Sequence, residues 1–239
     1  MPSPLVVIPT YNERENLAAI VGRVLTAEPA VAVLVVDDAS PDGTGALADE
    51  LAAADERVLV RHRAGKEGLG AAYLDAFAWA LEAGYDPIVQ MDADGSHLPE
   101  QLGGLLAPLR EGADLVIGSR WIPGGRIENW PRYRELLSRG GSAYARWVLR
   151  LPTRDATAGY RAFRADGLRR MRLDEVHTKG YGFQVDMLWH AHEAGLDVVE
   201  VPVTFVEREL GRSKMSLGIV LEAMLRVTGW GVAARFRRR

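Results

Sequence analysis

Cysteine is absent from the 239 residues, so the chain can form neither a disulfide nor a thiolate metal site. Long apolar runs are missing too, because no stretch approaches the roughly 20 apolar residues that a membrane-spanning helix needs. The opening Met1-Pro2-Ser3-Pro4, followed by a short apolar run, does not have the pattern of a signal peptide. We therefore expect a cytosolic protein without disulfides or spanning helices.

Charge is strongly segregated along the chain, although the net charge is only −3. Residues 1–119 carry 7 basic and 19 acidic side chains, whereas residues 120–172 carry 13 arginines and 4 acidic side chains. Isolated surface charges are ordinarily solvated, but a block of 13 arginines predicts a polyanionic ligand. A diphosphate, lipid phosphates and nucleic acid are all candidates.

Apolar strand patterns alternate with helix patterns through the first half of the chain. Strands are predicted at residues 5–8, 33–36, 58–60, 88–91 and 115–117, and helices begin near Asn12, Gly45, Ala71 and Pro99, with Asn12 as an N-cap. Continuous apolar strands separated by helices predict an α/β fold whose parallel sheet is covered on both faces. The ligand site of such a sheet lies outside the carboxyl ends of its strands.

The pattern loosens after Arg120. Residues 121–133 are rich in glycine, proline and tryptophan and predict a loop, which a helix over residues 133–149 follows. Residues 198–206 predict an edge strand interrupted by Pro202. The helix predicted from Ser216 onward fits either packing on the core or a membrane interface, where the four arginines of residues 235–239 would meet anionic lipid.

Asp92 and Asp94 are the strongest chemical signal in the sequence. They follow a buried strand, and side chains two apart on an extended segment project to the same side. Two converging carboxylates suit Mg²⁺ or Mn²⁺, which prefer oxygen ligands and accept phosphate oxygens alongside one or two carboxylates. The pairs Asp37-Asp38 and Asp92/Asp94, with Arg120, all fall at predicted strand ends, so together they indicate a metal and diphosphate site.

Seven segments, in order along the chain, resemble the signatures of family-2 glycosyltransferases with the GT-A fold. They are Pro9-Thr10-Tyr11-Asn12-Glu13, Val36-Asp37-Asp38-Ala39-Ser40-Pro41-Asp42-Gly43-Thr44, Asp92-Ala93-Asp94, Gly118-Ser119-Arg120, Gly180-Tyr181-Gly182-Phe183-Gln184, Val201-Pro202-Val203-Thr204-Phe205 and Arg208-Glu209-Leu210-Gly211-Arg212-Ser213-Lys214. Together they are similar to the dolichyl- or polyprenyl-phosphate mannosyltransferase branch. The resemblance implies a Rossmann-like, mostly parallel sheet with helices on both faces. It also implies a catalytic domain over residues 1–215 and a C-terminal amphipathic helix with a basic tail over residues 216–239.

The resemblance also implies roles for individual residues. Asp92, Asp94 and Arg120 would form the catalytic centre, and Asp94 with Ser96 would ligate Mg²⁺ or Mn²⁺. Arg134 and Ser138, one helical turn apart, would bind the acceptor phosphate. Asp186 stands where relatives often carry glutamate. The donor would contact Pro9, Tyr11, Glu13, Val36, Asp38, Asp92, Ala93, Asp94, Arg120, Arg208 and Lys214.

The reaction implied by the resemblance transfers mannose from GDP-mannose to a polyprenyl phosphate with inversion, giving polyprenyl β-D-mannosyl phosphate and GDP. UDP-glucose as donor is the enzymatic alternative, and a non-catalytic nucleotide-binding regulatory protein is an alternative from another class. Nucleic acid is disfavoured, because the motifs already give the arginines a diphosphate. A lipid acceptor implies peripheral attachment to the cytoplasmic face of a membrane and leaves room for a membrane-embedded helper protein.

Overall fold

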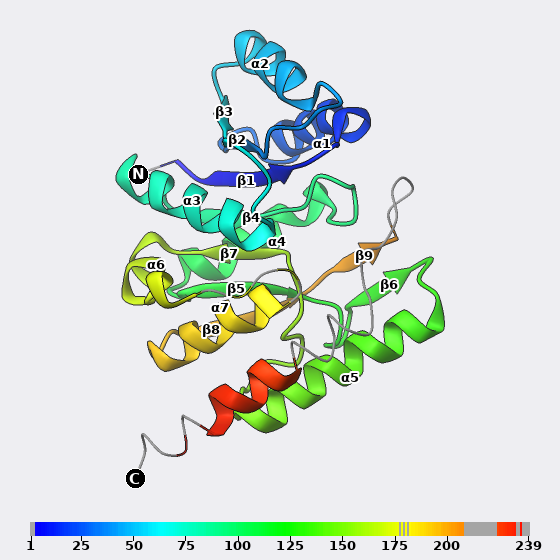
Figure 1. Cartoon of the computed structure of the whole chain (residues 1–239), viewed down its shortest axis with the longest axis vertical. Helices are drawn as coiled ribbons and strands as arrows, with labels where there is room; N and C mark the ends of the chain where they lie inside the picture. Colours follow the sequence, from blue (N-terminus) through cyan, green and yellow to red (C-terminus); the bar gives the residue numbers. More distant parts are fainter. Residues whose placement is uncertain are drawn as a thin grey trace.

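Helices cover both faces of a central sheet (Figure 1). The computed structural model describes residues 3–176, 178, 180, 182–207, 224–232 and 235. The strands are β1 (Leu5–Thr10), β2 (Ala32–Asp37), β3 (Val58–His62), β4 (Ile88–Gln90), β5 (Leu115–Ser119), β6 (Arg126–Glu128), β7 (Arg161–Phe163), β8 (Val198–Pro202) and β9 (Thr204–Val206). The α-helices are α1 (Arg14–Ala27), α2 (Thr44–Ala54), α3 (Leu69–Glu82), α4 (Leu102–Arg110), α5 (Arg132–Leu149), α6 (Ala165–Arg170) and α7 (Gly182–Glu193). Residues 224–232 are also helical.

The sheet has seven strands in the order β3-β2-β1-β4-β7-β5-β8. The strands β1 to β4 pair in parallel, as do β5 and β8, so the predicted mostly parallel α/β sheet is confirmed. Between these two parallel groups lies β7, which runs antiparallel to both β4 and β5. A second, two-stranded sheet joins β6 to β9.

The apolar runs of the strands follow from burial on both faces. In β1, Leu5 and Val7 enter the core beneath α3 and α7, whereas Val6 and Ile8 enter the core beneath α1 and α4. All four side chains are fully buried. An alternating polar pattern would place polar groups in one of these cores, so strands covered on both faces read as continuous apolar segments.

The predictions fail where an element depends on distant contacts. Asn12 is not the N-cap of α1: it has a left-handed φ of 61°, and α1 begins at Arg14. The predicted loop at residues 121–133 contains β6, and the predicted edge strand divides into β8 and β9 at Val203. The strand β8 does lie at the sheet edge, as its proline predicts.

The C-terminal helical segment lies beside α5 (Figure 1). The Tyr144 and Thr228 hydroxyl oxygens are 2.6 Å apart, and Val227 is buried in the same apolar core as Val148. Gly231 permits a close approach, because a Cβ there would lie 3.0 Å from the Val148 carbonyl oxygen. Within the residues described, no helix is both long and apolar enough to cross a bilayer.

A fully buried arginine, Arg161, joins β7 to the segments on either side of it. Its guanidinium donates hydrogen bonds to the carbonyl oxygens of Ala158, Gln184 and Ala156 at 2.9, 2.8 and 3.0 Å. Burial lowers the pKa of Arg161 to about 9, so the side chain remains charged at neutral pH. The carbonyls that it binds therefore depend on a buried cation for their hydrogen bonds.

We expect Arg161→Lys to lower the free energy of unfolding by about 2 to 4 kcal/mol, because a single ammonium nitrogen cannot reach all three carbonyls and each unsatisfied group costs about 1 to 3 kcal/mol. Urea unfolding measures the change, and Arg110→Lys on the exposed surface of α4 is the matched control. A stability of Arg161→Lys equal to that of the control would contradict this role.

Candidate active site

Polar side chains gather where β1, β2 and β4 end side by side. Thr10, the last residue of β1, is in register with Asp37, the last residue of β2, and its hydroxyl donates to the Asp37 carboxylate at 3.1 Å. Pro9 is in register with Val36, and the Asp38 amide donates to the Thr10 carbonyl oxygen. The parallel register thus brings these predicted donor residues to one edge.

The loop after β1 is held by the loop after β2. Backbone amides of Asn12, Glu13 and Arg14 donate to Ser40 Oγ, Thr44 Oγ1 and Asp42 Oδ2 at 3.1, 3.0 and 3.2 Å. These bonds satisfy amides at the start of α1, which explains why no side chain of the loop itself caps that helix. They also fix the positions of Tyr11 and Glu13 relative to Asp38.

Two basic residues that the sequence reasoning missed complete this part of the edge. Arg63 directly follows β3 and forms ion pairs with Asp38 and Glu67, and the Lys66 ammonium lies 3.6 Å from the centre of the Tyr11 ring. Arg63 could have been predicted by the rule that selected Asp38, because it also stands at the carboxyl end of a parallel strand.

Asp92 and Asp94 lie in the turn after β4. The Asp92 backbone amide donates to His97 Nδ1 at 3.0 Å, and Tyr73 Oη donates to Asp92 Oδ1 at 3.4 Å. Burial raises the pKa of the Tyr73 hydroxyl well above its usual value, and Asp92 adds to the shift, so the hydroxyl remains a donor. The Ser96 amide donates to Asp94 Oδ1 at 3.1 Å, which closes the turn.

His97 lies beneath this turn rather than open to a ligand. It is 3% exposed, stacks on Tyr160 with ring centres 4.9 Å apart, and meets the Phe205 ring edge-on. Burial lowers the pKa of His97, against the opposing effect of Asp92 and Asp94, so the ring is neutral at pH 7. Because Nδ1 accepts the Asp92 amide hydrogen, Nε2 carries the proton.

The donor set in this turn fits a hard divalent cation. Asp92 and Asp94 supply carboxylates, and the buried Ser96 Oγ has no hydrogen-bond partner within the described part of the chain. The described residues contain no cluster of three or more His, Cys, Asp or Glu that could hold a metal. One or two carboxylates with a hydroxyl match Mg²⁺ or Mn²⁺, which complete their shells with water and phosphate oxygens.

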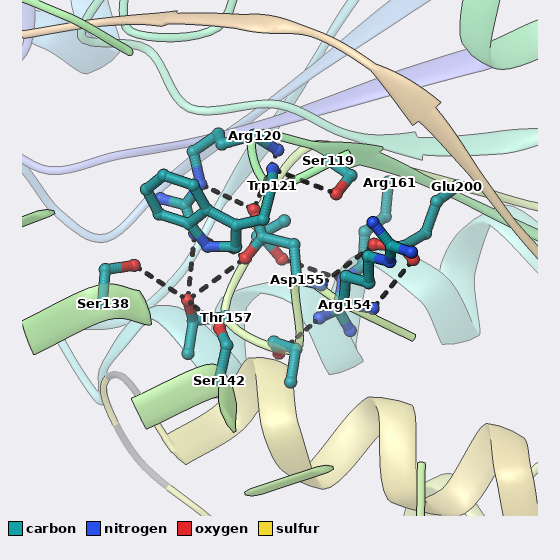
Figure 2. Close-up of polar contacts among 12 residues, drawn as sticks. Ser119, Arg120, Trp121, Ser138, Ser142, Arg154, Asp155, Thr157, Arg161 and Glu200 are labelled. Atoms are coloured by element: carbon teal, nitrogen blue, oxygen red, sulfur yellow. Dashed lines mark hydrogen bonds and ion pairs between the residues drawn. The ribbon is translucent and has the colours of Figure 1, made fainter. Parts of the chain in front are cut away.

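Arg120 follows β5 and is held by a buried carboxylate, as Figure 2 shows. Its Nε and Nη2 donate to Asp155 at 2.8 and 2.7 Å, and its backbone amide donates to Asp155 at 3.0 Å. The guanidinium also lies 5.2, 5.6 and 5.4 Å from the ring centres of Trp121, Trp130 and Phe205. Asp155 and these aromatic contacts were absent from the sequence reasoning.

A group of hydroxyls links Arg120 to α5 (Figure 2). Arg120 Nη2 donates to Thr157 Oγ1 at 2.9 Å, and this oxygen lies 3.2 Å from Ser138 Oγ and 3.3 Å from Ser142 Oγ. Thr157 therefore connects the end of β5 to the predicted acceptor residue Ser138. Nothing in its sequence neighbourhood marked it as more than a loop residue.

Arg134 occupies the same region as Arg120. The two guanidiniums lie 4.7 and 5.6 Å from the centre of the Trp130 ring, and Arg134 forms an ion pair with Glu207. Arg134 Nε is buried and has no hydrogen-bond partner among the residues described. The structure thus brings together Arg120, Arg134 and Ser138, with carboxylates already bound to both arginines.

The remaining residues named in the sequence reasoning are Arg208, Lys214 and Asp186. Arg208 and Lys214 fall outside the described residues. Asp186 is buried within α7, where it accepts hydrogen bonds from the Thr178 amide and hydroxyl at 3.3 and 2.6 Å. Its carboxylate also lies 3.5 Å from His190 Nε2 within the same helix, so its described contacts are with Thr178 and His190.

Comparison with known proteins identifies the family. Residues 5–172 match glycosyl transferase family 2. The chain is 57% identical over 235 residues to the polyprenol monophosphomannose synthase of Mycolicibacterium smegmatis, with 98% of this chain and 89% of that protein covered. It is 59% identical over 232 residues to the undecaprenyl-phosphate mannosyltransferase of Micrococcus luteus, with 97% and 95% covered.

A solved structure shares the fold. Glucosyl-3-phosphoglycerate synthase from Mycobacterium tuberculosis, crystallised with Mn²⁺, uridine diphosphate and glucosyl-3-phosphoglycerate, superposes with a TM-score of 0.66 at 21% identity. The match covers 98% of this chain and 80% of that one. With its mostly parallel, helix-covered sheet of the GT-A type, this chain belongs to glycosyl transferase family 2.

Proposed function

We propose that this protein transfers mannose from GDP-mannose to a polyprenyl phosphate, giving polyprenyl mannosyl phosphate and GDP. The observation that carries the proposal is the similarity, at 57% and 59% identity over nearly the whole chain, to relatives named for mannosyl products or transfer on polyprenyl lipids. The arrangement of charges supports it. His97 accepts from the Asp92 amide and meets the Phe205 ring, and the Arg120 guanidinium lies 5.4 Å from the centre of that same ring.

The donor is assigned to the ends of β1, β2 and β4. Tyr11, with Lys66 beside its ring, offers a surface for the base, and Glu13 and Asp38 offer acceptors for the nucleoside hydroxyls. Pro9, Val36 and Ala93 shape this edge, and Asp92 and Asp94 lie where the sugar diphosphate would follow. Arg208 and Lys214, which the family resemblance places among the donor contacts, are assigned to the diphosphate.

Asp94 and Ser96, with Asp92 beside them, are the residues that would hold Mg²⁺ or Mn²⁺. Such a cation, when bound, offsets negative charge on the diphosphate. Two features of these residues support the assignment. The Ser96 hydroxyl has no hydrogen-bond partner among the residues that the structure describes, and the Ser96 amide closes a turn on Asp94.

The acceptor phosphate is assigned to Arg134 and Ser138, next to Arg120. A phosphate monoester has its second pKa at about 6, so it is ionised at neutral pH and needs orientation more than a general base. In the proposed step one phosphate oxygen forms a bond to the anomeric carbon while the bond from that carbon to the β-phosphate oxygen breaks. The electron pair leaves with GDP, and this single displacement inverts the anomeric centre to give the β-linked product.

Arg120 is the residue placed to serve both substrates. Asp155 fixes its Nε and Nη2, so its orientation does not have to be established when substrate binds. Its charge lies between the carboxyl end of the sheet and α5, where it would stabilise negative charge on the diphosphate or acceptor.

The lipid acceptor also bears on location. A polyprenyl chain is buried in a bilayer, so we propose peripheral attachment to the cytoplasmic face of a membrane. The predicted C-terminal interfacial helix is described only over residues 224–232 and 235, and its membrane role stays a prediction. A membrane-embedded helper protein also stays a prediction, on which neither the fold nor the relatives bear.

We expect labelled mannose from GDP-mannose to enter the organic phase when the protein is incubated with polyprenyl phosphate and Mg²⁺ or Mn²⁺. We expect labelled glucose from UDP-glucose to enter it at least about tenfold more slowly, and EDTA to abolish the transfer. Faster transfer of glucose would favour the alternative donor. No transfer from either donor would contradict the proposed function and favour a non-catalytic nucleotide-binding protein.

Glu207 is expected to compete with the acceptor phosphate for Arg134, because both are anions and the Arg134–Glu207 pair is largely shielded from solvent. Glu207→Gln should lower the KM for polyprenyl phosphate by about 3- to 10-fold, or about 1 kcal/mol, with a smaller change in kcat.

Glu128→Gln is the matched control for Glu207→Gln. Glu128 is exposed, and it is a neighbour of Glu207 because its carbonyl oxygen accepts from the Glu207 amide. Its carboxylate lies 3.8 Å from Arg126 rather than at Arg134. Initial rates at varied acceptor concentration measure both variants. An equal decrease in KM in both would assign the effect to net charge, and a raised KM in Glu207→Gln would contradict the competition.

A further inference from the structure

The outer face of α5 carries large apolar side chains that no other described element covers. Leu136 and Trp147 are 74% and 75% exposed, Tyr133 is 64% exposed, and Leu137 is 38% exposed. Most large apolar side chains of this protein are buried, so four exposed ones on a single helix form an unusual patch.

Helical spacing places these residues on one side of α5. Positions 133, 136, 137, 140, 144 and 147 are separated by three or four residues, apart from one adjacent pair, and so follow a single stripe. The opposite side of the helix, which includes Arg134, Ser142, Ala145 and Val148, is buried against the protein. One face of α5 thus packs on the protein, and the other exposes an apolar stripe.

The described C-terminal helix extends the patch. It lies alongside α5 through the Tyr144–Thr228 contact and the close approach at Gly231. Its own outward residues include Leu225, 66% exposed, and Val232, 44% exposed. Figure 1 shows the two helices together at one end of the molecule, away from α1 and α2.

Arginines border the α5 stripe on one side. Arg132, Arg139 and Arg150 are all exposed. Glu135 is the single acidic residue of α5, and it is bound to Arg139 at 3.0 Å. An apolar stripe edged by cations matches a bilayer with anionic headgroups, because arginines can bind lipid phosphates while the apolar side chains enter the acyl boundary.

We propose that the outer face of α5, extended by the exposed residues of the helix at 224–232, docks on an anionic lipid bilayer. The choice of a bilayer over a protein partner rests on the proposed lipid acceptor. The inner face of the same helix carries Arg134 and Ser138, so docking would bring the acceptor-phosphate residues near the level of the lipid headgroups. A long polyprenyl chain could then remain in the bilayer while its phosphate reaches Arg120.

Vesicle flotation tests the docking without requiring catalysis. The full chain is floated with phosphatidylcholine vesicles that contain or lack phosphatidylglycerol. We expect binding to the anionic vesicles that weakens as salt is raised. We also expect a loss of at least about tenfold in the variant Leu136→Glu with Trp147→Glu, because two large apolar groups no longer enter the bilayer. Leu69→Glu, an exposed leucine on α3, is the matched control and should float as the wild type does.

A fluorescence measurement tests the same docking with variants that place no charge on α5. Because the chain has no cysteine, Leu136→Cys and Leu69→Cys each offer a single site for a polarity-sensitive dye. Anionic vesicles should shift the emission of the dye at position 136 to shorter wavelength and leave the dye at position 69 unchanged.

Three outcomes would overturn the docking: wild-type protein that does not float, a double variant that floats like the wild type, or a wild-type dimer in solution that the double variant converts to a monomer. The last would assign the patch to a second copy of the chain. Flotation with no sugar transfer would refute the proposed function alone, and transfer to a short, water-dispersed prenyl phosphate without flotation would refute the docking alone.

Discussion

The buried ion pair between Arg120 and Asp155 fixes the geometry on which the rest of the site depends. Asp155 is fully buried, so losing either partner would leave an uncompensated charge in the interior. The pair is anchored in turn by Glu200 of β8, which accepts from the amides of Arg154 and Asp155 at 2.8 and 2.9 Å (Figure 2). Thr157 then carries the connection to α5. The Arg120–Asp155 pair thus connects α5, which carries Arg134 and Ser138, to the carboxyl end of the sheet.

The arginines that are concentrated in residues 120–172 of the sequence are dispersed among separate contacts in the folded protein. Many arginines of residues 120–172 bind groups of the protein itself: Arg161 binds backbone carbonyls, Arg120 binds Asp155, and Arg170 binds Asp114. The block is therefore not a continuous surface for a polyanion. Arg120 and Arg134 nevertheless meet beside Trp130, and the exposed Arg132, Arg139 and Arg150 border the outer face of α5.

Sequence reasoning was most successful where the signal is local. Apolar runs predicted the main parallel strands, because a strand that is buried on both faces consists almost entirely of apolar residues. The alternation of strands and helices predicted the edge of the sheet at which Asp38 and Asp92 lie. It failed at β7, a three-residue strand that begins with Arg161 and is held by partners far away in the sequence. Asp155, Thr157 and Glu207 were missed for the same reason, since each acquires its role from a residue at least 35 positions away. Asn12 was misread because Asp42 and Thr44, beyond the next strand, satisfy the start of α1.

In the proposed function, a cation and a nucleoside diphosphate bind together at the carboxylates after β4. Calorimetric titration of GDP and UDP into the wild-type protein and Asp94→Asn, with Mn²⁺ or with EDTA, tests this claim most directly. We predict that GDP binds the wild type in Mn²⁺ at least about tenfold more tightly than UDP does, and that EDTA or Asp94→Asn weakens GDP binding by at least about tenfold. Asp166→Asn, a change at an exposed carboxylate of α6, should leave the affinity unchanged. GDP binding that is indifferent to both the metal and Asp94 would contradict the account.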